Sequence, residues 1–225
     1  MAKRTFFITG TDTDVGKTVV ATGLIETANQ AALSTAAIKP VAAGCELTES
    51  GMQNTDALLL QAAASYSLSY QQVNPITLKL AVAPHIAAAQ EGKTLSASRL
   101  SGFCRGLTLL PIDILFIEGA GGWRVPLNNR ETLADIPKQL NSEVILIVGL
   151  TLGCINHALL TAQAIRDDGL RLAGWVGNIL YPDMPCLDEN IDTLKRLIPE
   201  SCLGVVPWLG DMSPKQVASY VSLPN

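Results

Sequence analysis

The sequence lacks any block of basic residues beyond the two pairs Lys3–Arg4 and Lys195–Arg196. Its 16 Lys and Arg residues are outnumbered by 20 Asp and Glu residues, which gives a formal net charge of -4. A nucleic-acid groove or a surface that binds anionic lipid needs concentrated positive charge. The charge pattern therefore argues against nucleic acid and membrane as partners and favours a small molecule.

Long apolar runs and cysteine pairs are also missing. No stretch reaches the ~18 apolar residues of a membrane span, and the residues before Gly10 are too few for a signal-peptide core. An odd, scattered set of five cysteines without a C-x-x-C pair argues against a disulfide framework or a zinc site. We therefore expect a cytoplasmic protein whose cysteines are reduced. Each cysteine is expected to be an ordinary small residue that is buried or half-buried. They are Cys45, Cys104, Cys154, Cys186 and Cys202.

The chain does contain an alternation of short apolar segments with segments of helical period. The predicted strands are apolar at nearly every position, as strands buried on both faces are; they are 5–9, 35–40, 113–119, 143–150, 172–180 and 203–208. The predicted helices are 17–31, 56–64, 84–91, 96–109, 133–140, 156–168, 187–197 and 214–221. This order predicts one α/β domain over residues 1–225, with a doubly wound, mainly parallel sheet flanked by helices. The irregular stretch 42–74 is predicted to be an insertion over the carboxyl edge of the sheet.

A glycine-rich turn joins the first predicted strand to the first predicted helix and ends in Gly16, Lys17 and Thr18. Backbone N–H groups of such a turn converge on phosphate oxygens, the lysine reaches the β- and γ-phosphates, and the hydroxyl can ligate Mg²⁺. The spacing differs from G-x-x-x-x-G-K-[ST], because Gly10 comes one residue early and Thr11 stands at the usual first glycine. The pattern predicts a phosphate-binding (P-loop) fold with a loop that is one residue longer or differently folded.

Three further residues are candidates for the same site. Glu118 follows the apolar segment DILFI, as the acidic residue of a Walker B element does, and would hold Mg²⁺ directly or through water. Lys39 ends the second predicted strand, next to the first, and would either add positive charge to the transferred phosphoryl group or be merely solvated. Asp56 opens a predicted helix, where it is either a third ligand of Mg²⁺ or a helix cap.

The sequence resembles the dethiobiotin synthetase family over almost its whole length. The shared motifs occur in the family's order; they are GTDTDVGKT (10–18), KPVAAG (39–44), NTDALLLQ (54–61), VNPITL (73–78), APHIAAAQEGK (83–93), EGAGGW (118–123), LGCINHALLTAQAI (152–165), GWVGN (174–178) and VPWL (206–209). The GTDT-x-VGKT loop, with its extra residue, is a specific signature. The residues from 213 onward add little.

The resemblance implies an enzyme that uses ATP and Mg²⁺ to convert diaminopelargonic acid and CO₂ into dethiobiotin for biotin biosynthesis. It implies that Thr18, Asp56 and Glu118 hold Mg²⁺, that Lys17 holds the phosphates, and that Lys39 contacts the carbamate and the migrating phosphoryl group. Thr13 and Asp14 would lie beside the reacting groups, Asn178 would bind the purine, and residues 206–208 would contribute to the adenine pocket. The full set expected around the nucleotide is Asp14, Val15, Gly16, Lys17, Thr18, Val19, Asp56, Glu118, Gly119, Ala120, Gly121, Asn178, Val206, Pro207 and Trp208.

The substrate side of the expected site differs from the family pattern in two places. The family often has serine where Ala43 stands here and glutamate where Asp14 stands. The missing hydroxyl would cost on the order of 1 kcal/mol, so substrate binding is expected to be weaker without loss of catalysis. The differences leave open a paralogous P-loop ligase with a different substrate.

The segment LGCINHALL predicts a helix start whose free N–H groups can bind a carboxylate. Gly153, Cys154, Ile155 and Asn156 are the expected residues, and in the family this turn comes from the partner subunit. The resemblance therefore implies a homodimer with shared active sites. A partition- or site-selection-type ATPase is the alternative, but its loop carries an extra lysine, which Thr11–Thr13 lack. His85 and His157 have no partner at a metal-ligand spacing and are expected to have structural or local hydrogen-bonding roles.

Overall fold

A six-stranded parallel sheet organises the chain. The computed structural model describes residues 3–208, 210 and 213–225, so Leu209 of the VPWL motif lies outside the described residues. The strand order is β10-β9-β8-β1-β7-β2, and all neighbours pair in parallel. The strands are β1 (Arg4–Gly10), β2 (Thr35–Ile38), β7 (Ile114–Glu118), β8 (Glu143–Leu150), β9 (Leu172–Ile179) and β10 (Cys202–Val206). The predicted doubly wound parallel sheet is confirmed.

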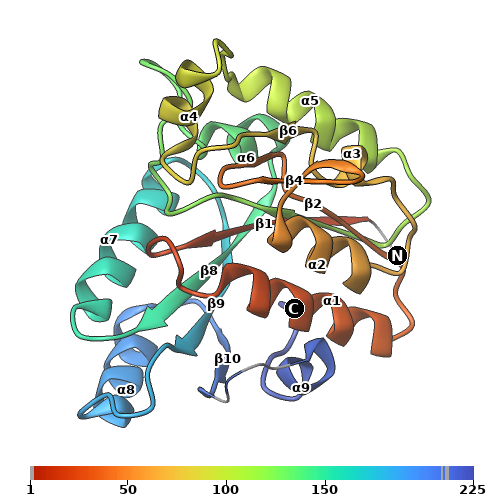
Figure 1. Ribbon diagram of the computed structural model, residues 1–225. Helices are drawn as coiled ribbons and strands as arrows, with labels where there is room; N and C mark the ends of the chain where they lie inside the picture. Colours follow the sequence, from red (N-terminus) through yellow and green to blue (C-terminus); the bar gives the residue numbers. More distant parts are fainter. Residues whose placement is uncertain (1–2, 209, 211–212) are drawn as a thin grey trace.

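Helices cover both faces of this sheet, because the chain runs from β1 out to β2 and then in the reverse direction through β7, β8, β9 and β10, and right-handed connections in the two directions lie on opposite faces. Figure 1 shows α1 (Lys17–Gln30), α2 (Thr55–Ala63) and α9 (Pro214–Ala218) along one side of the sheet. The other side carries α5 (Ala97–Thr108), α6 (Asp135–Leu140), α7 (Cys154–Asp167) and α8 (Leu187–Leu197). Within the described ranges, no helix is long and apolar enough to cross a membrane.

The core lies between the sheet and these two layers. Phe6 and Phe7 of β1 and Phe116 of β7 are almost completely buried, and the rings of Phe6 and Phe116 stack with centroids 5.9 Å apart. Each aromatic side chain buries a large apolar area, which stabilises the central strands. The two strands that bring Lys17 and Glu118 to the carboxyl edge are therefore rigidly held.

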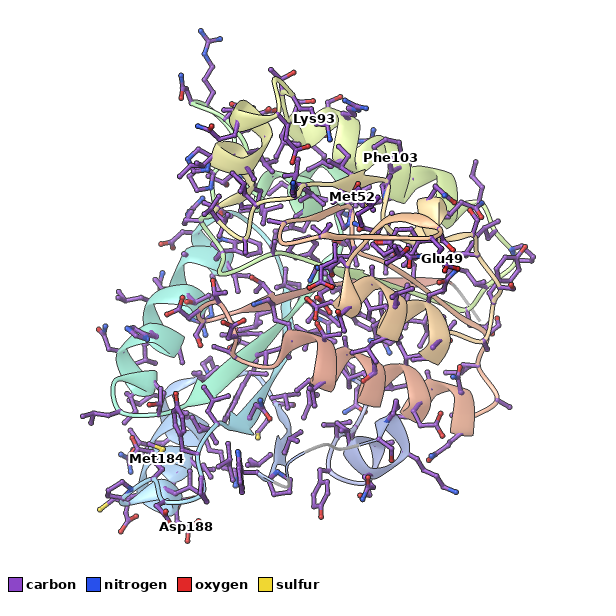
Figure 2. All side chains as sticks on the ribbon, in the orientation of Figure 1. Glu49, Met52, Lys93, Phe103, Met184 and Asp188 are labelled. Carbon is purple, nitrogen blue, oxygen red and sulfur yellow. The ribbon has the colours of Figure 1, made fainter. Side chains whose placement is uncertain are left out.

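The insertion at 42–74 is more regular than predicted. It contains the hairpin of β4 (Glu46–Thr48) and β5 (Gly51–Gln53), then α2 and the short α3 (Tyr70–Val73). Figure 2 shows the hairpin residues Glu49 and Met52 with their side chains. Next to it, β3 (Val41–Ala42) pairs with β6 (Ile76–Thr77), which leads to α4 (Pro84–Gln90). The pairing of β3 with β6 thus brings the two ends of the insertion together, directly after Lys39.

Three expectations need correction. Strand β2 is not next to β1, because β7 lies between them; sequence neighbours pair in space only when no later strand is inserted. Lys39 follows β2, which ends at Ile38, instead of lying within it. All five cysteines are free, as predicted, but Cys186 is exposed, since it lies in a turn with a left-handed backbone (φ 53°) before α8.

Candidate functional site

The loop between β1 and α1 has the features of an anion cradle. Helix α1 begins at Lys17, directly after Gly16, whose φ of 84° is left-handed. Among the described residues, no side chain caps this helix start, and its first turn contains no acidic residue. The backbone N–H groups and the positive end of the helix dipole therefore remain free for phosphate oxygens.

Glycine is required at position 16 for space as well as for conformation. A Cβ added there would lie 2.1 Å from Nδ2 of Asn178. That amide donates a hydrogen bond of 3.0 Å to the carbonyl oxygen of Val15, and Val15 itself is buried. Asn178, expected at the purine, thus braces the phosphate loop from the end of β9.

The side chain of Lys17, the first residue of α1, reaches back to this loop. Its ammonium donates a 2.9 Å hydrogen bond to the carbonyl oxygen of Asp12. Burial lowers the pKa of Lys17, the Glu118 carboxylate offsets part of that effect, and the ammonium of Lys39 adds to the lowering. The lysine is therefore already directed along the loop, where phosphate oxygens would lie.

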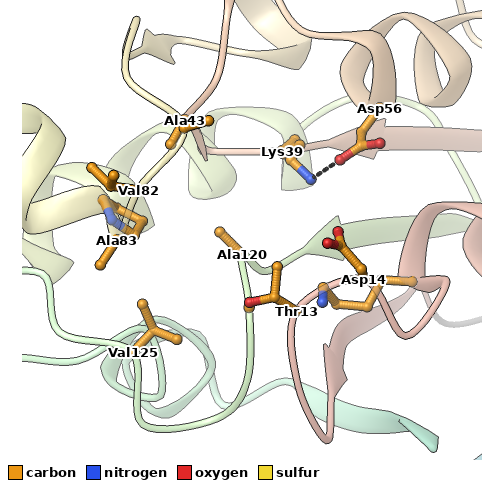
Figure 3. Close-up of a pocket in the computed structure, with 13 residues that line it drawn as sticks. Thr13, Asp14, Lys39, Ala43, Asp56, Val82, Ala83, Ala120 and Val125 are labelled. Carbon is orange, nitrogen blue, oxygen red and sulfur yellow. Dashed lines mark hydrogen bonds and ion pairs between the residues drawn. The ribbon is translucent and has the colours of Figure 1, made fainter. Parts of the chain in front are cut away.

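Lys39 stands between two carboxylates. Its ammonium lies 2.7 Å from Oδ2 of Asp56 and 2.5 Å from Oε1 of Glu118, and the hydroxyl of Thr18 donates to the same Oε1 at 3.0 Å. Figure 3 shows the contact between Lys39 and Asp56. Because β7 lies between β1 and β2, Glu118 stands between the phosphate loop and Lys39 and connects them. Thr18, Lys39, Asp56 and Glu118, which the sequence predicted to share one site, therefore do lie together.

The charge on Lys39 is secured by this arrangement. Burial alone would lower the pKa of Lys39, but the carboxylates of Glu118 and Asp56 outweigh it and hold the pKa above its ordinary value. Lys39 is therefore a cation at neutral pH. A buried cation at this point can stabilise negative charge that develops on a reacting group.

Asp56 is not the cap of its helix. The side chain of Asn54 caps α2 by accepting a hydrogen bond from the N–H of Ala57 at 3.3 Å. Asp56 is the second residue of the helix, in its first turn, and its carboxylate contacts Lys39. The helix-cap interpretation is wrong, and Asp56 belongs to the polar cluster.

The residues expected around Mg²⁺ fit a hard divalent cation. Thr18, Asp56 and Glu118 supply hydroxyl and carboxylate oxygens, the ligands that Mg²⁺ prefers. Oε2 of Glu118 is buried without a hydrogen-bond partner among the described residues. No described group of three or more His, Cys, Asp or Glu residues has the arrangement of a metal centre, so phosphate oxygens or water would have to complete the coordination.

Two adjoining cavities open at this edge of the sheet. The smaller, of about 240 Å³, is lined by Asp14, Gly16, Lys17, Thr18, Val19 and Asp56. The larger, of about 510 Å³, is lined by Thr13, Asp14, Lys17, Lys39, Ala43, Asp56, Ala81, Val82, Ala83, Pro84, Ala120, Gly121 and Val125. Figure 3 shows its charged residues gathered at one end and Ala43, Val82, Ala83 and Val125 at the other. The cavity thus suits a molecule with a polar end and an aliphatic end.

Other expected residues lie outside these cavities. Val206 is buried in β10, and Pro207 and the half-exposed Trp208 follow it. Gly119 is the first residue after β7 and donates its N–H to the carbonyl of Ile8. Residues 153–156 form the start of α7, where Gly153 has a φ of 94° and no side chain caps the helix. The structure does not bring this helix start to the cavities of its own chain.

The two histidines take no part in the cavities. His85 is half-buried in α4, and its Nδ1 has no hydrogen-bond partner among the residues that the structure describes. His157 is exposed on α7. Their structural or local roles stay predictions.

Sequence reasoning missed the apolar wall of the larger cavity. Ala81, Val82 and Pro84 come from the loop before α4 and from its first residue, and Val125 comes from an irregular segment far away in the chain. Ala83 and Pro84 belong to a shared motif, but nothing in the local pattern distinguishes these residues from ordinary loop residues. Only the tertiary structure places them opposite Thr13.

Comparisons with known proteins agree on one family. The family described as "AAA domain" matches residues 4–216. The chain is 57% identical over 223 residues to the ATP-dependent dethiobiotin synthetase BioD of Cellvibrio japonicus, covering 99% of this chain and 97% of the relative. It is 52% identical over 218 residues to the protein of that name from Pseudomonas aeruginosa (strain UCBPP-PA14), covering 97% and 96%. The BioD 1 protein of Escherichia coli O157:H7 is 47% identical over 225 residues, covering 99% of each chain.

Solved structures support the fold alone. A ParA family ATPase from Chlorobium tepidum matches with a TM-score of 0.57 at 13% identity, covering 97% of this chain and 91% of that chain. The MinC:MinD cell division complex of Aquifex aeolicus matches with a TM-score of 0.59 at 11% identity, covering 96% and 85%. At such low sequence identity, a similar fold is no evidence of a similar function. The likeness therefore does not support the partition-type alternative. The relatives with high identity decide the matter: the chain belongs to the family of ATP-dependent dethiobiotin synthetases.

Proposed function

We propose that the chain is one catalytic domain that forms dethiobiotin from diaminopelargonic acid, CO₂ and ATP in the cytoplasm. The observation that carries the proposal is the cluster of Lys39, Glu118, Asp56 and Thr18 between an anion-binding loop and a cavity with an apolar wall. Phosphate chemistry fits the loop, and an aliphatic diamine fits the cavity. Membership of the synthetase family agrees with both.

The proposed reaction has three steps. One amine of the substrate adds to CO₂ and loses a proton, which gives a carbamate. A carbamate oxygen then attacks the γ-phosphorus of ATP, and ADP leaves with the electron pair of the broken P–O bond. The second amine attacks the carbonyl carbon, the C–O bond to the phosphate breaks, and a proton and inorganic phosphate are released as the ureido ring closes.

No protein nucleophile is needed, so the chain's residues would act by positioning and charge. Lys17 would hold the phosphates, and Lys39 would stabilise the carbamate and the migrating phosphoryl group. Thr13 and Asp14 line the larger cavity, where they would contact the reacting amines. Asn178 and residues 206–208 would contact the purine.

Thr18, Asp56 and Glu118 would hold Mg²⁺, which supplies neutralisation of phosphate charge when bound. The buried, unpartnered Oε2 of Glu118 supports this assignment. The apolar end of the cavity, which includes Ala43 and Val125, would take the aliphatic chain of the substrate. The methyl side chain of Ala43 cannot form a hydrogen bond with the polar end of the substrate.

The carboxylate of the substrate lies at the far end of a long chain from its amines, so its binding site has to be distant from the phosphates. At the uncapped start of α7, the N–H of Cys154 donates to the carbonyl of Thr151, which leaves the N–H groups of Ile155 and Asn156 to bind a carboxylate. Because this helix start lies away from the cavities of its own chain, we propose that it serves the site of a partner subunit in a homodimer. The exposed Leu152 and Leu160 beside it would be covered there.

ADP release by the purified protein tests the proposed function. Release should depend on both diaminopelargonic acid and bicarbonate, and dethiobiotin should appear in equal amount. A Thr18→Ala variant should lose the Mg²⁺-dependent part of the rate. ADP release that ignores the diamine would contradict the proposal.

A further inference from the structure

The wall of the larger cavity opposite the insertion is an irregular segment. Residues 119–125 follow β7, and Ala120, Gly121 and Val125 line the cavity. A Cβ at Gly121 would lie 2.9 Å from Cγ2 of Val125 and 3.4 Å from Oγ1 of Thr13. This part of the segment therefore packs tightly against the phosphate loop, although it belongs to no helix or strand. Side chains have to hold it in place.

One carboxylate holds the segment. Oδ2 of Asp168 accepts the indole N–H of Trp123 at 2.8 Å and lies 2.9 Å from Nη1 of Arg124. Two consecutive residues of the wall are thus tied to a single oxygen. Trp123 is 4% exposed, and its ring meets that of Phe7 in β1 edge to face, with centroids 6.2 Å apart. The indole therefore has one fixed position between the sheet and Asp168.

The place of Asp168 in the fold is unfavourable without these partners. It is the cap residue at the carboxyl end of α7, where the helix dipole repels negative charge. Its side chain is only 11% exposed, so solvent screens it little. Trp123, Arg124 and Lys138, whose ammonium lies 3.6 Å from Oδ1, are the groups that compensate. The carboxylate is stable there because it is bound to the wall.

We propose that Asp168 is a positioning residue for the diamine: through Trp123 and Arg124 it holds residues 119–125 at the distance from Thr13 and Lys39 that the reaction needs. The inference rests on the proposed function, because it assigns the larger cavity to the diamine. Ala120 and Gly121, which the resemblance led us to expect around the nucleotide, line the larger cavity and not the smaller one, so the inference places this segment on the diamine side of the site. Loss of Asp168 should thus affect one substrate and spare the other.

Steady-state kinetics of Asp168→Ala and Trp123→Phe test the proposal. Each variant should raise KM for diaminopelargonic acid about fivefold or more, the usual effect of one lost hydrogen bond, and leave KM for ATP within about twofold. The double variant should be no worse than the poorer single variant, because Asp168→Ala already removes the hydrogen bond that Trp123→Phe breaks. Effects that multiply, or equal shifts in both KM values, would overturn the proposal.

Glu200→Gln is the matched control. It removes the charge of Glu200 and one of its two hydrogen bonds with Arg166 near the same end of α7, and neither residue lines the two cavities. It should lower Tm and leave both KM values unchanged. If Asp168→Ala lowers Tm as this control does, with an unchanged KM for the diamine, Asp168 is merely structural and the proposal is wrong.

Asp168→Asn covers the case in which Asp168→Ala does not fold. Its amide oxygen can still accept the indole N–H, so its KM for the diamine should lie between those of wild type and Trp123→Phe; a value as high as that of Trp123→Phe would contradict the role of this contact. A wild-type protein without diamine-dependent turnover would instead overturn the proposed function, which keeps the two failures distinct.

Discussion

At the scale of single residues, the buried cluster around Lys39 ties catalysis to stability. Glu118 is 1% exposed and Lys39 is 5% exposed, so neither charge is solvated when its partner is removed. Breaking a buried ion pair from one side costs about 3 to 5 kcal/mol, although the intact pair adds little net stability. A substitution here therefore has two effects that need separate measurements.

Lys39→Ala is expected to lower turnover at least about tenfold, because the buried cation near the carbamate is lost. It should also lower the free energy of unfolding by about 3 kcal/mol, since Glu118 loses its cation. Lys17→Ala should lower turnover to a similar extent. Turnover is measured well below the Tm of each variant, and exposed Lys79→Ala serves as the control. Wild-type turnover in Lys39→Ala would show that its proposed role is wrong.

Ala43→Ser restores the hydroxyl that the family often has at this position. Ala43 lines the larger cavity but not the smaller one. The apparent KM for diaminopelargonic acid is expected to fall about fivefold, the value of one hydrogen bond, with KM for ATP nearly unchanged. Ala81→Ser on the same cavity is the control and should change neither value. An unchanged or higher KM for the diamine would show that the hydroxyl is irrelevant here.

The sequence predicted the polar residues of the site better than the apolar ones. Lys17, Thr18 and Glu118 stand at fixed offsets from strand ends, and the carboxyl ends of parallel strands share one edge. Val82 and Val125 have no such offset, because the path of a long loop depends on packing. Asp168 is 45 residues from Trp123, and only the fold brings them together.

At the scale of elements, a strong apolar period in the sequence and clear signals at the ends of helices were sufficient to predict most element boundaries. Helix α8 begins at Leu187 and ends at Leu197 as predicted, with acidic residues in its first turn and basic ones in its last. The hairpin β4–β5 was missed because its six residues are all at least partly exposed and show no apolar alternation. Helix α3 spans only four residues, too few for a periodic signal.

Gly16→Ala tests the phosphate loop as an element. The new methyl group would meet Asn178 Nδ2 at 2.1 Å and the backbone would be held at a φ of 84°, so the loop has to shift. We expect ATP affinity, measured by calorimetry, to fall at least about tenfold and stability to fall by about 1 to 2 kcal/mol.

Gly106→Ala is the matched control for this loop. Gly106 lies on the exposed side of α5 with nothing within 4 Å of an added Cβ. The control should raise stability by about 0.5 to 1 kcal/mol, because alanine favours helix, and leave ATP binding unchanged. Normal ATP affinity in Gly16→Ala would contradict the assignment of the loop as a phosphate cradle.

At the scale of the whole molecule, strand order decides which residues meet. The sequence indicated six strands, but their order in space depends on long-range pairing that local patterns do not encode. Insertion of β7 between β1 and β2 brings Glu118 between Lys17 and Lys39. The same order leaves the ends of the sheet at β2 and β10, and the C-terminal residues return beside β10 through the bridge of Gly204 with Val221.

The ion pair of Arg166 with Glu200 links α7 to the segment before β10 and predicts part of the acid sensitivity. The hydrogen bond from Arg166 holds the pKa of Glu200 below its ordinary value. A lowered pKa means that the pair stabilises the fold above the ordinary pKa of a glutamate and that this contribution is lost as the pH falls through the lowered value. Between about pH 6 and about pH 3, wild type should lose more stability than Glu200→Gln, by under about 1 kcal/mol because the pair is partly exposed. Parallel curves from denaturant titrations would contradict this assignment.

The proposed homodimer predicts complementation between two inactive subunits. Lys17→Ala removes the phosphate site of its own chain, and Gly153→Glu places a negative side chain at the start of α7, where the partner's substrate carboxylate would bind. A heterodimer of the two keeps one complete site, so after subunit exchange it should regain up to about half of the activity of one wild-type dimer.

Gly92→Glu controls for backbone strain in this experiment, because its φ of 63° is also left-handed and an added Cβ there has nothing within 4 Å. That variant should remain active alone, since Gly92 lies outside α7 and is not among the residues that line the two cavities. Mass spectrometry of differently tagged subunits would establish that exchange has occurred. A mixture of Lys17→Ala and Gly153→Glu that stays inactive despite proven exchange would show that each chain binds its substrate without the helix start of its partner.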